Sequence, residues 1–391
     1  MFKTPAEVFE QERRYIMPTY RRQPVVLTEG KGAVVTDSTG KEYIDCVGGI
    51  AVNAVGYCHP AVVQAIQAQA AKLMHVSNLY YTEPQVQLAE KLVALTGMSK
   101  AFFCNSGAES IEAAVKLACK ATGKSRFIAA RGSFHGRTII SLSATYEPKF
   151  RAPFTPLLLK SVDFVPYNDP GAIREAITAE TAAVIVEPIQ GESGIHVPSP
   201  GYLNEVREIC TEQDVLLIFD EVQTGFGRTG AWFGKDHEGV QPDIMTLAKA
   251  LGAGFPIGAI LARAGLEFDA GEHASTFGGT PLACATALAS IRVIEEEQLV
   301  ERSRALGAYF LGQARSEHGF AFSPVVQEIR GKGLMIGIEL KKPCAEFVAK
   351  ALERGILINC TADTVIRLVP PLVISKEQLD TVITVLREIL E

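Results

Sequence analysis

Lys249 is the residue with the clearest chemical potential in this sequence, because it lies in the apolar and small-residue segment 246–258. An ammonium group in such surroundings is poorly solvated, which favours the neutral amine. A neutral lysine amine is a nucleophile toward aldehydes and forms a Schiff base with them. Most lysines are solvated surface residues, so Lys249 needs a chemical partner before it can be assigned a role.

An acidic residue upstream supplies that partner, since the apolar run 215–219 ends at Asp220. A lone aspartate at the end of a strand is most often a turn residue or a helix cap. Combined with a desolvated lysine, it meets the two needs of pyridoxal phosphate. The lysine holds the aldehyde carbon, and the carboxylate keeps the ring nitrogen protonated. The pair predicts a site for this cofactor and no metal.

Two glycine-containing segments have the composition of a cofactor cradle. In segment 105–114 a predicted strand turns into a predicted helix at Ser106, Gly107 and Ala108, where free N–H groups favour a phosphate. The alternative is a capping box with Glu109, and a capped helix can also bind phosphate.

Segment 133–138 combines an aromatic ring with a cation. Phe134 could stack on a planar ring, and Arg137 could grip a carboxylate bidentately. The alternative is a surface turn with a core phenylalanine. His135 is expected to be a structural hydrogen-bond donor.

Glu192 and Arg367 each place one charge in an apolar or glycine-rich setting. If they met, they would form a switchable salt bridge. Two independent surface charges are the alternative, which the sequence alone favours.

Segment 225–230 matches the dinucleotide fingerprint G-x-G-x-x-G, which would indicate a nicotinamide-dependent dehydrogenase. The genuine fingerprint turns directly from a strand into a helix. Here other residues intervene after the strand, and the following segment is a poor helix former, so we discount the match. A non-enzymatic binding protein would be expected to lack Lys249 or Asp220.

The composition of the chain limits the other classes of protein to which it could belong. The chain has 391 residues, which predicts about two domains, and its net charge of -6 argues against non-specific nucleic-acid binding. No apolar stretch approaches the ~20 residues of a membrane span, and the N-terminus lacks a signal-peptide pattern. The eight cysteines form no Cys-x-x-Cys pair. We expect most of them to be small core residues of a protein in the reducing cytosol.

Helical and strand patterns alternate from about residue 60, which predicts an α/β fold with a mainly parallel sheet flanked by helices. Predicted helices cover 61–74, 84–95, 108–122, 172–179 and 202–213, and predicted strands cover 101–104, 127–130, 162–165, 182–186 and 215–219. After about 285 we expect one amphipathic helix, two strands around 328–340, another helix and a strand at 365–368. The predicted division is an N-terminal segment 1–60, with a hairpin over 34–44, that contributes to the small domain; a large cofactor-binding domain 61–284; and a small α+β domain 285–391.

Taken together, the motifs resemble those of the fold-type I, class-III aminotransferases, and most closely the acetylornithine aminotransferases of arginine biosynthesis. The resemblance covers nearly the whole chain. It is carried in order by the segments 105–109, 133–138, 217–230, 248–252 and 275–279.

The resemblance implies a role for each site residue. Lys249 would bind the cofactor and shuttle a proton, and Asp220 would pair with the ring nitrogen. The cofactor-binding set would be Ser106, Gly107, Ala108, Phe134, Asp220, Val222, Gln223, Lys249 and Thr276. The substrate-binding set would be Arg137, Glu192, Ser275 and Arg367. Thr276 would reach the phosphate of a neighbouring subunit, which implies a homodimer with a shared active site.

The resemblance also implies two substrates that use one site in turn. Arg137 would bind the α-carboxylate of N-acetylornithine while Glu192 neutralises Arg367, and Arg367 would then take the α-carboxylate of 2-oxoglutarate. Segment 48–53 lacks the tyrosine of ornithine aminotransferases, which leaves room for an acyl group. Tyr57, Ser193 and Thr280 depart from the usual His, Gly and Asn of the family. Ornithine, 4-aminobutyrate, succinylornithine and carrier-linked lysine aminotransferases remain alternatives, and a glutamate-semialdehyde mutase fits less well because the arginine clamp is present.

Overall fold

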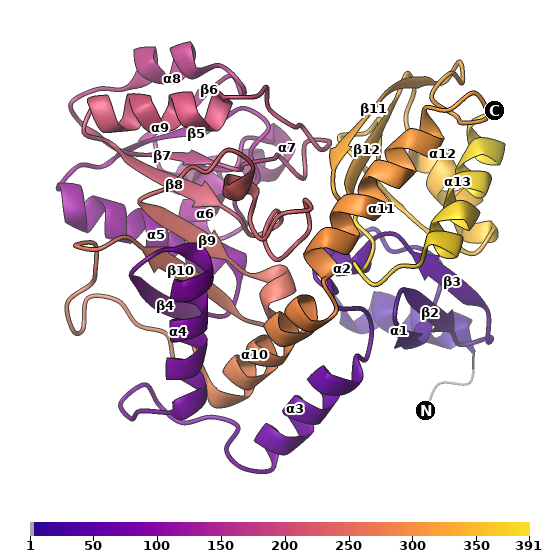
Figure 1. Ribbon diagram of the computed structural model, residues 1–391, viewed down its shortest axis with the longest axis horizontal. Helices are drawn as coiled ribbons and strands as arrows, with labels where there is room; N and C mark the ends of the chain where they lie inside the picture. The colour runs from indigo at the N-terminus through magenta and orange to yellow at the C-terminus, as the bar shows by residue number, and fades with distance from the viewer. Residues whose placement is uncertain (1–3) are drawn as a thin grey trace.

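The computed structural model describes residues 4–391, which form two lobes joined by helices (Figure 1). The larger lobe is built on a seven-stranded sheet in the order β4-β10-β9-β8-β7-β5-β6. Strands β9, β8, β7, β5 and β6 pair in parallel, whereas β10 is antiparallel to both of its neighbours. The fold is therefore the predicted α/β class with a mainly parallel sheet. In sheet order the strands are β4 (Lys100–Cys104), β10 (Gly258–Ala262), β9 (Ile244–Leu247), β8 (Leu216–Asp220), β7 (Thr181–Val186), β5 (Arg126–Ala130) and β6 (Val162–Val165).

Both faces of this sheet are covered because alternate side chains of each strand point to opposite sides. Ala183 and Ile185 of β7 join the core beneath α5 (Gly107–Thr122). Val184 and Val186 join the core beneath α9 (Tyr202–Glu212). A strand buried on both faces needs a continuous apolar sequence, which explains the apolar runs on which the sequence analysis relied.

The remaining helices of this lobe are α3 (Pro60–Ala70), α4 (Glu83–Thr96), α6 (Ile139–Ser143), α7 (Pro148–Arg151), α8 (Pro170–Ala176) and α10 (Pro281–Glu296), with short 3-10 turns η1 (Ala152–Leu157), η2 (Gly234–His237) and η3 (Lys249–Gly252). The helix predicted over 61–74 is wrong at its end, because α3 stops at Ala70. The predicted helix after 285 is in fact two helices. They separate at Gln298, whose φ of 52° lies in the left-handed region.

The smaller lobe holds two four-stranded sheets. The first, in the order β11-β12-β15-β14, is antiparallel and is made of β11 (Val326–Lys332), β12 (Met335–Leu340), β15 (Val365–Leu368) and β14 (Asn359–Thr361). Its helices are α11 (Leu299–Ala314), α12 (Ala345–Glu353) and α13 (Lys376–Leu390).

The second sheet joins the two ends of the chain. The N-terminal strands β1 (Leu27–Lys31), β2 (Val34–Asp37) and β3 (Glu42–Asp45) are extended by β13 (Ile356–Leu357), which is parallel to β3. The predicted hairpin is therefore present, and its strand β3 pairs with β13 of the C-terminal part (Figure 1). Helices α1 (Pro5–Tyr15) and α2 (Gly48–Ala51) flank this sheet in sequence. The division at residues 60 and 284 stays a prediction, and α10 crosses the second boundary.

Segment 225–230 has a structural role in place of nucleotide binding. It follows β8 without entering a helix, and the fully buried Arg228 donates hydrogen bonds to the carbonyls of Leu334 and Pro370. At Gly230 an added Cβ would lie 2.9 Å from Cβ of Arg304 in α11. The glycines of this segment therefore allow the large lobe to contact the small one closely.

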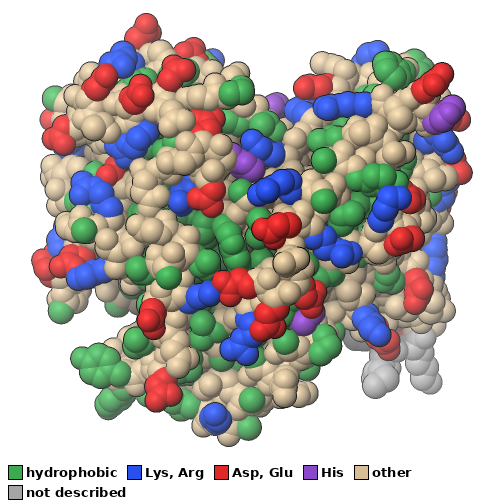
Figure 2. All heavy atoms as spheres, viewed as in Figure 1, with side chains coloured by type: hydrophobic (Ala, Val, Ile, Leu, Met, Phe, Trp, Pro, Cys, Tyr) green, Lys and Arg blue, Asp and Glu red, His purple; other side chains and the backbone are tan. Residues whose placement is uncertain are grey.

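The surface is mixed in charge. Figure 2 shows a hollow between the lobes, with acidic and basic side chains interspersed on the face in view. Within residues 4–391, no helix has both the length and the apolar composition that crossing a bilayer requires.

The cysteine prediction needs a correction, because Cys344 and Cys360 form a disulfide. They are separated by 16 positions and meet where the start of α12 lies beside β14. Cys46, Cys104, Cys210 and Cys284 are buried free thiols, as expected for small core residues.

Gly307 in α11 offers a test of how closely this helix packs on the turn between β11 and β12 in the small lobe. A Cβ at this position would overlap the backbone carbonyl of Gly333, whereas a Cβ at Gly312 on the same helix meets nothing within 4 Å. We predict that Gly307→Ala lowers the free energy of unfolding by about 1–3 kcal/mol, because backbone cannot move aside as a side chain can. Gly312→Ala should raise it by ~0.5–1 kcal/mol through helix propensity. The urea midpoints of unfolding measure both changes in stability. Equal changes in the two variants would contradict the close approach of Gly307 to the Gly333 backbone.

Candidate active site

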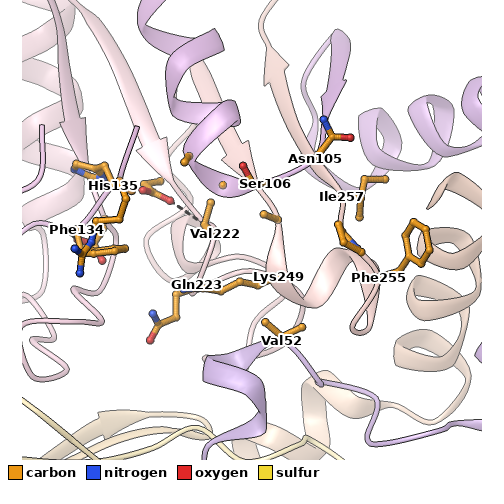
Figure 3. Close-up of a pocket in the computed structure, with 18 of the residues that line it drawn as sticks. Val52, Asn105, Ser106, Phe134, His135, Val222, Gln223, Lys249, Phe255 and Ile257 are labelled. Atoms are coloured by element: carbon orange, nitrogen blue, oxygen red, sulfur yellow. Dashed lines mark hydrogen bonds and ion pairs between the residues drawn. The ribbon is translucent and has the colours of Figure 1, made fainter. Parts of the chain in front are cut away.

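A cavity of about 450 Å³ opens at the carboxyl ends of the central strands, where α/β sheets bind their ligands. Figure 3 shows Lys249, Val222 and Gln223 around its centre, with Phe134 and His135 on one side. The lining includes most of the predicted site residues: Ser106, Gly107, Ala108, Phe134, Arg137, Asp220, Val222, Gln223 and Lys249. The end of β4, the segment after β5 and the ends of β8 and β9 thus meet in one place.

Lys249 begins the turn η3 directly after β9 and has a φ of 46°, an uncommon value for a residue with a side chain. Backbone strain of this kind costs of order 1–3 kcal/mol and tends to occur at functional sites. Burial lowers the pKa of the Lys249 amine, and although the charge of Glu192 opposes this effect, the net shift is downward. The setting therefore favours a neutral, nucleophilic amine, as its sequence neighbours predicted.

Asp220 is buried, and three donors hold its carboxylate. His135 Nδ1 lies 2.7 Å from Oδ2, while Oδ1 accepts hydrogen bonds from the Val222 amide (3.1 Å) and the Thr246 hydroxyl (3.2 Å). Burial works against charge on His135, but the bond to Asp220 outweighs it and raises the pKa of the imidazole. A carboxylate fixed in this way can hold a proton on a ring nitrogen.

The turn before α5 forms a small cradle. Ser106 caps the helix by accepting a hydrogen bond from the Glu109 amide (3.2 Å). The capping box is incomplete, because the Glu109 carboxylate accepts from the Asn105 amide (2.9 Å). The helix N-terminus still faces the cavity, where its free N–H groups favour an anion. A Cβ at Gly107 would lie 2.9 Å from Cγ1 of Val222, so only glycine leaves this space open.

The aromatic and cationic side of the cavity comes from the segment after β5. The guanidinium carbon of Arg137 lies 3.5 Å from the ring centroid of Phe150 and 5.6 Å from that of Phe134. Stacking on an aromatic ring holds the planar cation while its N–H groups stay free to bind a carboxylate.

Glu192 and Arg367 form an ion pair, with 2.5 Å between Oε1 and Nη1. Arg367 is 1% exposed, so the alternative of two independent surface charges is wrong. Gln223 contacts both partners, at 3.4 Å from Glu192 and 3.5 Å from Arg367. Burial raises the pKa of Glu192, but the Arg367 and Lys249 charges more than offset this and lower it overall. The unusual Ser193 beside the pair bonds to Gln190 instead of Glu192.

Glu187, at the end of β7, was not among the predicted site residues. One of its carboxylate oxygens accepts a hydrogen bond from the Phe134 amide (2.9 Å), and the other accepts one from the Gly191 amide (3.1 Å). It therefore joins the segment that carries the aromatic ring to the segment that carries Glu192. Burial raises the pKa of Glu187 to about 7. A carboxylate directly after an apolar run, as at Asp220, was the available sequence signal.

Ser275 and Thr276 lie outside this cavity. Ser275 Oγ accepts hydrogen bonds from the Asn105 amide group (3.2 Å) and the Gly278 amide (3.0 Å), and Thr276 is exposed. Within one chain, these two residues do not meet the other predicted ones.

The residues present fit pyridoxal phosphate. A buried amine, a buried carboxylate held by three donors and an open glycine cradle at a helix N-terminus surround one cavity. Within residues 4–391, no group of three potential metal ligands gathers in one place.

Comparison with known proteins identifies the family. The family model "Aminotransferase class-III" matches residues 15–390. The chain is 63% identical to the acetylornithine aminotransferase of Methanosarcina mazei, over 97% of this chain and 95% of that protein. It is 48% identical to the Archaeoglobus fulgidus acetylornithine aminotransferase, over 96% and 98% of the two chains.

Comparison with solved structures supports the same family. The ornithine aminotransferase of Toxoplasma gondii superposes with a TM-score of 0.96 at 36% identity, covering 100% of this chain and 95% of that one. The acetylornithine aminotransferase of Elizabethkingia anophelis has a TM-score of 0.88 at 35% identity, covering 100% and 99%. The chain therefore belongs to the class-III aminotransferases. The prediction of a pyridoxal phosphate-dependent aminotransferase is confirmed, and the dehydrogenase alternative is set aside.

The raised pKa of Glu187 predicts a dependence of stability on pH. Between about pH 4.5 and 7 the folded state keeps a proton that the unfolded state has lost, so the free energy of unfolding falls as pH rises through this window. Glu187→Gln should flatten that slope, while the buried Glu221, whose pKa is also raised to about 7, retains its own contribution. Unfolding with saturating cofactor at several pH values tests this, and an unchanged slope would contradict it.

Proposed function

We propose that this class-III aminotransferase transfers the distal amino group of N-acetylornithine to 2-oxoglutarate, giving N-acetylglutamate semialdehyde and glutamate, a step of arginine biosynthesis. The names of relatives that are 63% and 48% identical to this chain support this donor. The observation that carries the two-substrate scheme is the ion pair between the half-buried Glu192 and the buried Arg367, whose charges both act on Lys249.

Pyridoxal phosphate, when bound, supplies an aldehyde that captures the amino group and a ring that accepts electrons. Ser106, Gly107 and Ala108 would hold its phosphate at the start of α5. Asp220 would keep a proton on the ring nitrogen, with His135 holding the carboxylate in place. Phe134 would stack on one face of the ring. Val222 and Gln223 would lie on the other face, with Gln223 near the ring hydroxyl.

Lys249 would be the catalytic residue. Burial lowers the pKa of its Nζ, which favours the neutral amine that would hold the cofactor. Once the amino group of the substrate has displaced it, the freed Nζ would take a proton from the reacting carbon of the substrate. The strained backbone at Lys249 fixes the direction in which its side chain leaves the main chain.

Arg137 and Arg367 would divide the two substrates between them. N-acetylornithine would place its α-carboxylate on Arg137 and its distal amine at Lys249, while Glu192 cancels the charge of Arg367. When the keto acid enters, Glu192 would move away, and Arg367 would bind the α-carboxylate. The 3.4–3.5 Å contacts of Gln223 with both partners support a pair that can separate, because Gln223 remains available to either one.

The segment Gly48–Val52 supports an acylated donor. It carries only small and aliphatic side chains, and Val52 lines the cavity. Ile50 and Ala51 have φ of 63° and 62°, so the chain makes a left-handed turn in this segment.

The active site would be completed by a second copy of the chain in the cytoplasm. The half-buried Ser275 and the exposed Thr276 would reach the partner's site, with Thr276 on its phosphate. Large apolar side chains exposed on the same chain support this homodimer; they include Leu79, Tyr80, Tyr81 and Phe277.

The donor is tested by a half-reaction without keto acid. Protein loaded with cofactor is mixed separately with N-acetylornithine, ornithine, 4-aminobutyrate and an acylated lysine, and the loss of the visible cofactor absorbance is followed. We predict the fastest loss with N-acetylornithine. Faster loss with ornithine or 4-aminobutyrate would retain the chemistry and refute the assigned donor.

The same assay includes a matched pair of variants. Arg137→Ala should slow the N-acetylornithine reaction by about 10- to 100-fold, the value of a lost charged hydrogen bond. Arg131→Ala removes an exposed arginine outside the cavity and should have little effect.

A further inference from the structure

The Cys344–Cys360 disulfide connects a helix to the strand that supports the substrate switch. Cys344 caps α12 and is buried, while Cys360 is the central residue of β14. Strand β14 is only three residues long and lies at the edge of its sheet, paired with β15 alone. A short edge strand has few backbone bonds, so a covalent tether contributes much of what holds it in place.

Both neighbours of Cys360 contact the Glu192–Arg367 pair. The side-chain carbonyl of Asn359 accepts a hydrogen bond from Arg367 Nε (3.3 Å), and the Thr361 hydroxyl donates to the backbone carbonyl of Glu192. Cys360 itself lies opposite Ile366 in the β14–β15 register, next to Arg367. A shift of β14 would therefore move groups bound to each partner of the pair.

Access favours one sulfur over the other. Cys360 is partly exposed and lines a second cavity of about 1060 Å³, between the N-terminal segment and α12. The buried thiols differ, because burial raises the pKa of Cys104, Cys210 and Cys284 to about 12 each. Thiols with such pKa values react poorly, which leaves the disulfide, the exposed Cys58 and the half-buried Cys119 as the sites of redox chemistry.

We propose that the thiol–disulfide state of Cys344 and Cys360 sets the affinity of the enzyme for its keto-acid substrate. This inference rests on the proposed role of Arg367 in binding that substrate. With the disulfide formed, β14 is tethered and Asn359 holds the Arg367 guanidinium in place. With the disulfide reduced, β14 loses its tether, and Arg367 is less well placed for a carboxylate.

The redox step balances with a dithiol as reductant. One thiolate of the dithiol attacks Cys360 Sγ, the S–S bond breaks, and Cys344 leaves as a thiolate that takes up a proton. The second thiolate of the reductant then displaces Cys360, which also becomes a thiol, and the reductant ends as a disulfide. In a reducing compartment, the disulfides that do form are commonly transient or sensing, which suits a switch.

The test compares holoenzyme before and after treatment with dithiothreitol, which is then removed. Each form is first assayed for free thiols, and the reduced form should have two more free thiols per chain than the untreated form. The two half-reactions are then measured separately, with N-acetylornithine and with 2-oxoglutarate. We expect reduction to raise the KM for 2-oxoglutarate by about 3- to 10-fold, and the donor half-reaction to change by less than about two-fold.

Two variants show whether the change in KM comes from this disulfide or from a general loss of stability. The double variant Cys344→Ser, Cys360→Ser should show the raised KM with or without dithiothreitol. Cys58→Ser, which removes an exposed thiol elsewhere, should respond as the original enzyme does. Equal KM values in the two redox forms, or no thiols released on reduction, would overturn the inference. If neither form reacts with 2-oxoglutarate, the proposed function itself fails.

Discussion

The desolvation of Lys249 is the constraint on which the rest of the site depends. A lysine amine is nucleophilic only without its proton, and burial at the end of β9 favours that form. Burial also requires that every other charge in the cavity be matched, since an unpaired buried ion costs several kcal/mol. The surrounding residues are arranged accordingly. Asp220 is bonded to His135, Glu192 is paired with Arg367, and Glu187 accepts two backbone hydrogen bonds.

The sheet explains how residues so distant in sequence meet. Parallel strands end at one edge, so Ser106, Glu187, Asp220 and Lys249 all follow strands that run in the same direction. Arg367 comes from the small lobe and contacts Glu192 and the cavity residue Gln223 across the interface. Movement between the lobes would therefore act directly on the Glu192–Arg367 pair. Strand β14, which pairs with the strand that carries Arg367, bonds to both partners of that pair.

Much of the fold and site could be predicted from the sequence, because both leave local signals. Continuous apolar runs marked β5, β7 and β8, and Lys249 and Asp220 are unusual in their immediate settings. Strands β9 and β10 were not predicted, since each is a short apolar run next to small residues and glycines that look like loop. The ion pair between Glu192 and Arg367 was only one of two alternatives, because a contact between lobes leaves no trace in spacing.

Other features of the site could not be predicted from the sequence at all. The bonds of Glu187 depend on how two separate segments fold back onto β7, and the Cys344–Cys360 pairing depends on where α12 starts relative to β14.

Lys249 is nevertheless the residue on which the whole account depends, and replacing it is the most direct measurement. Lys249→Ala and Lys249→Arg, purified with pyridoxal phosphate, should show no turnover and none of the visible absorbance that borohydride abolishes in the original enzyme. Measurable turnover in either variant would contradict the account.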